Sequence, residues 1–165
     1  MKNKGLGLIQ ILLVIALSAV IALAATRYYS EVKITQKATA LWQQAVTITN
    51  AVSQCVSSFK PGQTTTTSSM TDYCQSFSNL KKAGYLTVAA QTNPWEGSNG
   101  LGVSQQSDST VIKVWIGADL VPSNICDKLN MKAQEIYTVT QNGTTYTGLT
   151  NMNSTKCAFN LYITQ

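Results

Sequence analysis

Residues 6–25 read LGLIQILLVIALSAVIALAA, an almost entirely apolar run. Only Gln10 and Ser18 within it carry polar side chains. A helix of about twenty residues rises about 30 Å, which matches the hydrocarbon core of a bilayer. Lys2 and Lys4 precede the run, and a short basic start favours an N-terminus held in the cytoplasm. The stretch therefore predicts a chain that is inserted into a membrane or exported.

An amphipathic stripe continues the helix beyond the apolar run. No Pro or Gly interrupts residues 8–60, so we expect one helix over that range, ended by Pro61-Gly62. A coiled coil is the alternative, but a single stripe favours packing on the chain's own C-terminal half. The apolar positions of the stripe alternate three and four residues apart, as Ile34, Ala38, Leu41, Ala45, Ile48, Val52, Cys55 and Phe59.

The C-terminal half predicts short helices and strands. Turn residues separate runs rich in β-branched and aromatic side chains, which is typical of antiparallel strands. We therefore expect an α+β fold, with the long helix packed on an antiparallel sheet. The expected elements are a helix from about Thr71 to Ala83, a turn at 93–97, a strand at 111–116, a helix from Cys126 to Gln134, strands at 135–140 and 157–163, and a hairpin turn at Asn142-Gly143.

Composition excludes several functional classes. The net charge is +5, and without residues 1–5, which hold two lysines, 10 basic residues face 7 acidic ones. A nucleic-acid-binding domain shows a clustered basic face, and the sequence has no such run, so no nucleic-acid partner is expected. The chain contains no His, which excludes Ser-His and Cys-His nucleophiles within it. We expect no enzyme activity, no cofactor and no metal site.

The four cysteines predict disulfides rather than a metal site. They are Cys55, Cys74, Cys126 and Cys157, and none forms a CxxC pair. A structural zinc site draws on close pairs, whereas an even count behind an export-type N-terminus favours two disulfides. Four cysteines allow three pairings, and the spacing does not choose between them.

The large aromatic residues are interpreted as packing residues. Trp42, Trp95 and Trp115 would suit a ligand platform, but such residues are more often part of a core. Trp115 lies in a strand pattern where a core position is the default. Trp95 is expected to pack on the C-terminal half of the chain. Tyr28 and Tyr29 follow the apolar run directly and are interpreted as anchors at the membrane surface.

The N-terminus resembles the signature of type IV pilins. A short basic leader, residues 1–5, ends in Gly5 directly before the hydrophobic helix. The resemblance implies cleavage after Gly5 by prepilin peptidase and N-methylation of Leu6. The fifth mature residue is Glu in the family and is Gln10 here. The family's Glu pairs with the N-terminal amine of a neighbouring subunit, and a neutral amide would make that contact more weakly.

The C-terminal half resembles type IVb pilins, including those of conjugative plasmids. Asn93-Pro94-Trp95-Glu96-Gly97 is similar to an N-P-W-G-G-like turn, with Glu96 in place of the first Gly of its pair. Residues 121–129, VPSNICDKL, are similar to the family's cysteine-bearing helix. The resemblance implies a Cys126–Cys157 bond, which leaves Cys55 to pair with Cys74.

The resemblance implies a structural subunit with four segments. These are a leader at 1–5, a transmembrane and filament-core helix at 6–26, the amphipathic half of that helix at 27–60, and a globular disulfide-bonded head at 61–165. Before assembly the helix would lie in the inner membrane with the head in the periplasm, and afterwards in an extracellular helical filament used for adhesion or conjugation. The implied partners are further copies of the chain, prepilin peptidase, the assembly platform, its ATPase and an outer-membrane secretin.

Three alternatives stay open at this point. The chain is a pseudopilin of a type II secretion machine, or a single-span membrane protein that never polymerises. The third alternative is a secreted enzyme, because the alanine-rich end of the apolar run, Ala22 to Ala25, offers a signal-peptide cleavage site.

Overall fold

The computed structural model describes residues 4–59, 70–86, 91–106, 110–153 and 156–164. Its chain divides into two compact units, residues 1–37 and 38–165, and each is described by itself. Helix α1 (Lys4–Ser58) has 55 residues and belongs to both units. The expected unbroken helix is therefore confirmed as far as Ser58, while Pro61 and Gly62 lie outside the described residues.

The first unit consists of the N-terminal part of α1. By length and composition, this is the one helix among the described residues that is long and apolar enough to cross a membrane. The large apolar side chains from Leu8 to Leu23 are exposed.

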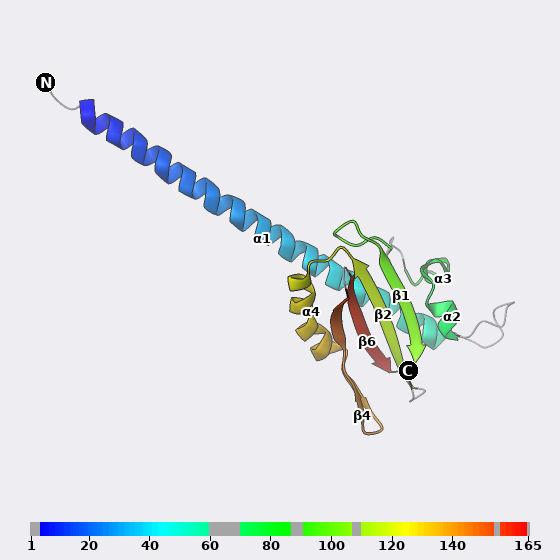
Figure 1. The fold of residues 1–165 in the computed structure, drawn as a ribbon. Helices are drawn as coiled ribbons and strands as arrows, with labels where there is room; N and C mark the ends of the chain where they lie inside the picture. The colour runs from blue at the N-terminus through cyan, green and yellow to red at the C-terminus, as the bar shows by residue number, and fades with distance from the viewer. Residues whose placement is uncertain (1–3, 60–69, 87–90, 107–109, 154–155, 165) are drawn as a thin grey trace. The chain divides into compact units, whose positions relative to one another are not determined.

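The second unit has the expected α+β architecture (Figure 1). Its four-stranded antiparallel sheet has the strand order β1-β2-β6-β5, and a separate hairpin pairs β3 with β4. The remaining helices are α2 (Met70–Cys74), α3 (Phe77–Lys82) and α4 (Ser123–Ile136). The strands are β1 (Asn99–Gln105), β2 (Val111–Asp119), β3 (Val139–Gln141), β4 (Thr144–Tyr146), β5 (Leu149–Asn153) and β6 (Lys156–Thr164).

The core of this unit lies between the C-terminal part of α1 and the sheet. The expected stripe is buried from Leu41 to Cys55, where each of its members is 0–2% exposed. Trp42 joins the stripe and packs its ring 6.3 Å from that of Phe159 on β6. Ile34, the first member of the stripe, belongs to the other unit and is 41% exposed. The compact unit thus begins at Ala38, inside the amphipathic half of the helix.

Two expected elements were wrong in their extent. The single helix expected from Thr71 to Ala83 is two helices, because the Ser76 hydroxyl accepts a hydrogen bond from the Asn79 N–H and starts α3. The strand expected at 135–140 begins only at Val139. Helix α4 continues to Ile136, since Leu129 and Ala133 prolong its buried face.

Trp115 does not lie in the core, contrary to the expectation from its strand pattern. Ile112, Val114 and Ile116 of β2 point into the core, so Trp115 points to the opposite face of the sheet. The period of two identifies the two faces of a strand, but it does not show which one is covered. Trp42 is buried and Trp95 packs against the core, as expected.

Candidate functional site

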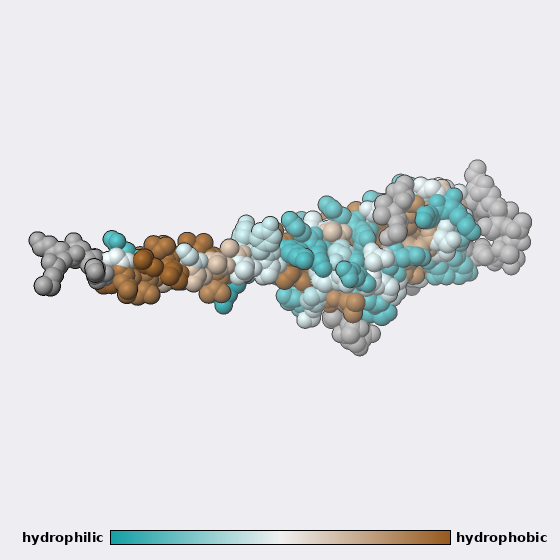
Figure 2. All heavy atoms as spheres, turned by 90° about the horizontal axis from the view of Figure 1, so that it is seen from above, coloured by the Kyte–Doolittle hydropathy of each residue, from teal (hydrophilic) through white to brown (hydrophobic). Residues whose placement is uncertain are grey.

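The apolar half of α1 presents hydrophobic side chains on every side. Each large apolar side chain from Leu8 to Leu23 is between 58% and 66% exposed. Figure 2 shows hydrophobic side chains gathered along this part of the helix. Soluble proteins rarely expose a continuous apolar surface of this length, so it requires a hydrophobic environment from lipid or from other helices.

The hydroxyl groups along this helix are satisfied by its own backbone. Ser18 donates to the Val14 carbonyl at 2.7 Å, Thr26 to the Leu23 carbonyl at 2.9 Å, and Ser30 to the Arg27 carbonyl at 2.8 Å. A hydroxyl bonded in this way adds little cost in a medium without water. These bonds make the segment compatible with the interior of a membrane.

The side chain of Gln10 differs from these hydroxyl groups, which are bonded to the helix backbone. Its side chain is exposed, and its amide forms no hydrogen bond with any described residue. An amide in hydrocarbon needs a partner, and neighbouring helices are a usual source. Within the described part of the chain, Gln10 is thus the polar side chain of the apolar run that has no partner.

Gly5 and Leu6 lie in the first turns of α1. The first three residues of the expected leader, Met1 to Asn3, lie outside the described part of the chain. Cleavage after Gly5 and methylation of Leu6 therefore stay predictions.

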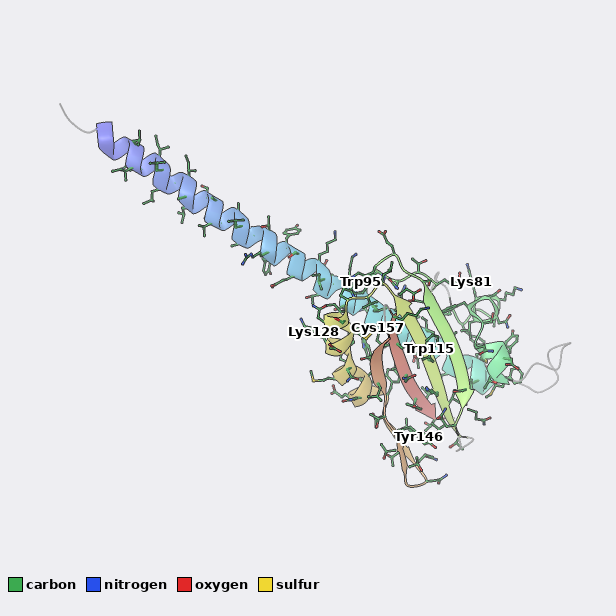
Figure 3. The ribbon with its side chains drawn as sticks, viewed as in Figure 1. Lys81, Trp95, Trp115, Lys128, Tyr146 and Cys157 are labelled. Atoms are coloured by element: carbon green, nitrogen blue, oxygen red, sulfur yellow. A yellow bond between two sulfur atoms is a disulfide. The ribbon has the colours of Figure 1, made fainter. Side chains whose placement is uncertain are left out.

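Two disulfides cross-link the second unit. Cys55 of α1 is bonded to Cys74 of α2, with Cα atoms 5.9 Å apart. Cys126 of α4 is bonded to Cys157 of β6, with Cα atoms 5.6 Å apart. These are the two pairs that the resemblance implied, and every one of the four residues is at most 2% exposed. Each bond fixes one helix to the core, and Figure 3 labels Cys157 on its strand.

The turn at residues 93–97 is held by one buried side chain. Asn93 is 4% exposed, and its Oδ1 accepts hydrogen bonds from the backbone N–H groups of Trp95 at 2.8 Å and Gly97 at 3.3 Å. Its Nδ2 donates to the backbone carbonyl of Asp119 at 2.8 Å. One amide thus closes the turn and ties it to the end of β2. The sequence indicated the turn, but it gave no sign of this link to residue 119.

The carboxylate of Asp119 links the residue after this turn, Ser98, to β6. It accepts a hydrogen bond from the Ser98 hydroxyl and lies 3.2 Å from the ammonium of Lys156. The bond from Ser98 and then the contact with Lys156 hold the pKa of Asp119 below its usual value. The carboxylate thus stays charged at neutral pH and joins β2, β6 and the turn through one group.

Replacement of Gly97 by Ala tests how closely the turn approaches β2. A Cβ atom at Gly97 would lie 2.5 Å from the Asp119 carbonyl oxygen, which is backbone and has little freedom to move. We expect Gly97→Ala to lower the free energy of unfolding by about 2–3 kcal/mol in urea denaturation followed by circular dichroism. Gly102→Ala is the matched control, because its Cβ would lie at an ordinary 3.5 Å from the Trp115 ring. Equal effects of the two changes would contradict the close approach.

Comparisons of the chain with protein-family models, with curated proteins and with solved structures found no match.

Proposed function

We propose that this chain is a structural subunit of a type IVb-like pilus, stored in the inner membrane and polymerised through its N-terminal helix. The observation that carries the proposal is the nature of α1, which is apolar on every side around residues 8–23 and buried along one stripe from Leu41 to Cys55. The first part requires an apolar environment, and the second part belongs to a folded head.

A helix that is apolar all round suits two environments equally well. In lipid its side chains contact acyl chains, and in a filament they contact the helices of neighbouring subunits. Transfer from one environment to the other costs little, because the apolar surface stays away from water in both. The filament is built by this exchange, driven by an assembly platform and its ATPase, and it leaves the cell through an outer-membrane secretin.

The head supports a position outside the cytoplasm. Its two disulfides persist in oxidising compartments such as the periplasm and the cell exterior. The role is structural, so it needs no cofactor or catalytic residue. Adhesion or conjugation is the use that the type IVb resemblance implies.

The turn geometry also supports the resemblance. Glu96 has a φ of 63°, in the left-handed region that favours Gly. The similar turn of type IVb pilins carries Gly at this position, and the observed backbone gives a physical reason for that choice. Glu96 adopts the same conformation at some cost in strain.

The N-terminal residues have defined roles in this proposal. Prepilin peptidase cuts after Gly5, and the freed amine of Leu6 is methylated. The amide oxygen of Gln10 then accepts a hydrogen bond from the Leu6 amine of a neighbouring subunit. This contact sets the register of the helices, more weakly than a carboxylate would.

The Gln10→Glu variant tests the proposed contact. A carboxylate adds charge attraction to the hydrogen bond with an ammonium, whereas a neutral amide supplies the hydrogen bond alone. We expect incorporation into filaments to equal or exceed that of the wild type, in cells that carry a type IVb assembly machine. The measurement is the fraction of subunit in sheared filaments relative to the membrane fraction, by immunoblot.

Gln10→Leu removes the amide and should reduce incorporation by about threefold or more at an unchanged membrane level. Gln36→Leu is the matched control, because Gln36 is an exposed glutamine of the same helix outside the apolar run. Loss of incorporation in Gln10→Glu would show that the neutral amide itself is required, and would refute its role as a weakened acid.

A further inference from the structure

On the outer face of the sheet, the indole ring of Trp115 packs against three glycines. Trp115 points away from the core, and its six-membered ring lies over Gly100, Gly102 and Gly117. A Cβ atom would lie 2.7 Å from Cη2 of the ring at Gly117, 3.1 Å from Cζ3 at Gly100, and 3.5 Å from Cε3 at Gly102. The glycines let the ring approach the backbone closely, and the side chain remains partly exposed.

Other partly exposed side chains lie on the same face of the sheet. The register of β2 and β6 sets Asn160 opposite Trp115 and Tyr162 opposite Lys113. The ring of Tyr146 on β4 lies 5.6 Å from the ring of Tyr162. We call these five residues the Trp115 platform; Figure 3 labels Trp115 on its strand and Tyr146 on the β3-β4 hairpin.

The polar groups of the Trp115 platform retain unused bonding capacity. No described carboxylate forms an ion pair with Lys113, and Asp119 of the same strand pairs with Lys156. The Oδ1 atom of Asn160 is buried and has no hydrogen-bond partner among the described residues. A rotation of this amide about χ2 exchanges its oxygen with Nδ2, so either atom can face outward. A buried acceptor without a partner is costly, which calls for an explanation.

We propose that the Trp115 platform binds an acidic sugar, a pyranose that carries a carboxylate. The C–H face of a pyranose stacks on the exposed face of an indole in the way that other flat apolar groups do. Sugar hydroxyl groups bond to the Asn160 amide, and the sugar carboxylate pairs with the Lys113 ammonium. Tyr162 and Tyr146 extend the aromatic surface for the next sugar of a chain.

The composition of the Trp115 platform favours a sugar over a second copy of this chain. The centres of protein–protein interfaces are depleted in lysine and other charged residues. This face carries Lys113 two residues from Trp115 on the same strand, with no ion pair to a described carboxylate. The inference does not depend on filament assembly, since a single subunit carries all five residues.

Titration with 3′-sialyllactose tests the proposal, with lactose as the matched ligand that lacks the carboxylated sugar. The full chain is kept in a sugar-free polyoxyethylene detergent, and the indole N–H signals are followed by ¹H–¹⁵N NMR. We expect sialyllactose to shift the Trp115 signal with a Kd of about 1 mM or tighter, and lactose to bind about threefold or more weakly.

Three variants test which residues bind the sugar. Trp115→Ala should weaken sialyllactose binding about tenfold, measured on the sugar signals by saturation transfer. Lys113→Gln leaves the glycine contacts of Trp115 in place, and should remove the preference for sialyllactose over lactose even if Trp115→Ala fails to fold. Trp95→Phe is the control, because Trp95 lies in the turn and should leave binding unchanged.

Two results would overturn the proposal. The first is no shift of the Trp115 signal at about 20 mM sialyllactose, where even a weak site is largely occupied. The second is a change of the Trp115 signal on dilution of the protein without sugar, which would assign the face to a second copy of the chain.

Discussion

Replacing Cys126 and Cys157 together by Ser should lower the free energy of unfolding by about 3–4 kcal/mol. The bond closes a loop with a sequence separation of 31 residues, and its loss returns chain entropy to the unfolded state. Both residues are at most 1% exposed, so the serine hydroxyls would be buried away from water. Urea denaturation of the full chain, followed by near-UV circular dichroism, measures the change.

The second disulfide provides the matched comparison. The Cys55–Cys74 bond closes a shorter loop, with a separation of 19 residues, so its removal should cost about 3 kcal/mol. Unchanged unfolding midpoints in both double variants would contradict the view that the two bonds stabilise the folded unit. An effect of the Cys126–Cys157 change alone would show that the tether between α1 and α2 is dispensable.

Replacing Ile15 by Lys should abolish filament assembly while much of the protein stays in the membrane. Ile15 lies near the middle of the apolar run and is 60% exposed. A lysine at the centre of a membrane helix costs about 3 kcal/mol on insertion scales, which the other apolar residues offset in part. In a packed bundle of helices the same charge is buried without a partner, and we expect at least about a tenfold loss of subunit from sheared filaments.

The control for this change is Ile15→Val, which keeps the apolar surface and should assemble normally. Comparing the membrane and filament fractions separates the two roles of the helix. Filaments at the wild-type level in Ile15→Lys would contradict burial of this segment between subunits. A membrane fraction without filaments in every variant, including the wild type, would favour a single-span protein that does not polymerise.

The helix could be predicted from sequence because its signal is long and redundant. From Leu41 to Cys55 the three-and-four spacing repeats without interruption, and each expected position is buried. The hairpin at Asn142-Gly143 was equally well marked, since both residues have the positive φ that its turn requires. The α+β class followed from these two kinds of pattern.

Strand β1 could not be predicted from its residues. It reads NGLGVSQ, and its two glycines and polar residues have low preference for strands. It forms because β2 pairs with it along its whole length, and because the Trp115 ring covers its glycines. Such tertiary contacts also explain why the strand pattern predicted Trp115 on the core face of the sheet, whereas it lies on the outer face.

The candidate site was predictable where single residues carry the signal. Gln10 stands out in an apolar run, and the structure adds that its amide has no partner among the described residues. The cysteines were evident, but their pairing needed either the resemblance or the structure. The link from Asn93 to Asp119 spans 26 residues and leaves no local pattern.

The identity of the mature N-terminus distinguishes a pilin subunit from the other candidate proteins. Intact and peptide mass spectrometry of the subunit, taken from cells that make the assembly machine, reports the first residue and its modification. A pilin subunit is expected to begin at Leu6 with a methylated amine and to retain both disulfides. A chain that still begins at Met1, or one cut near Thr26 at the end of the apolar run, would contradict the proposal.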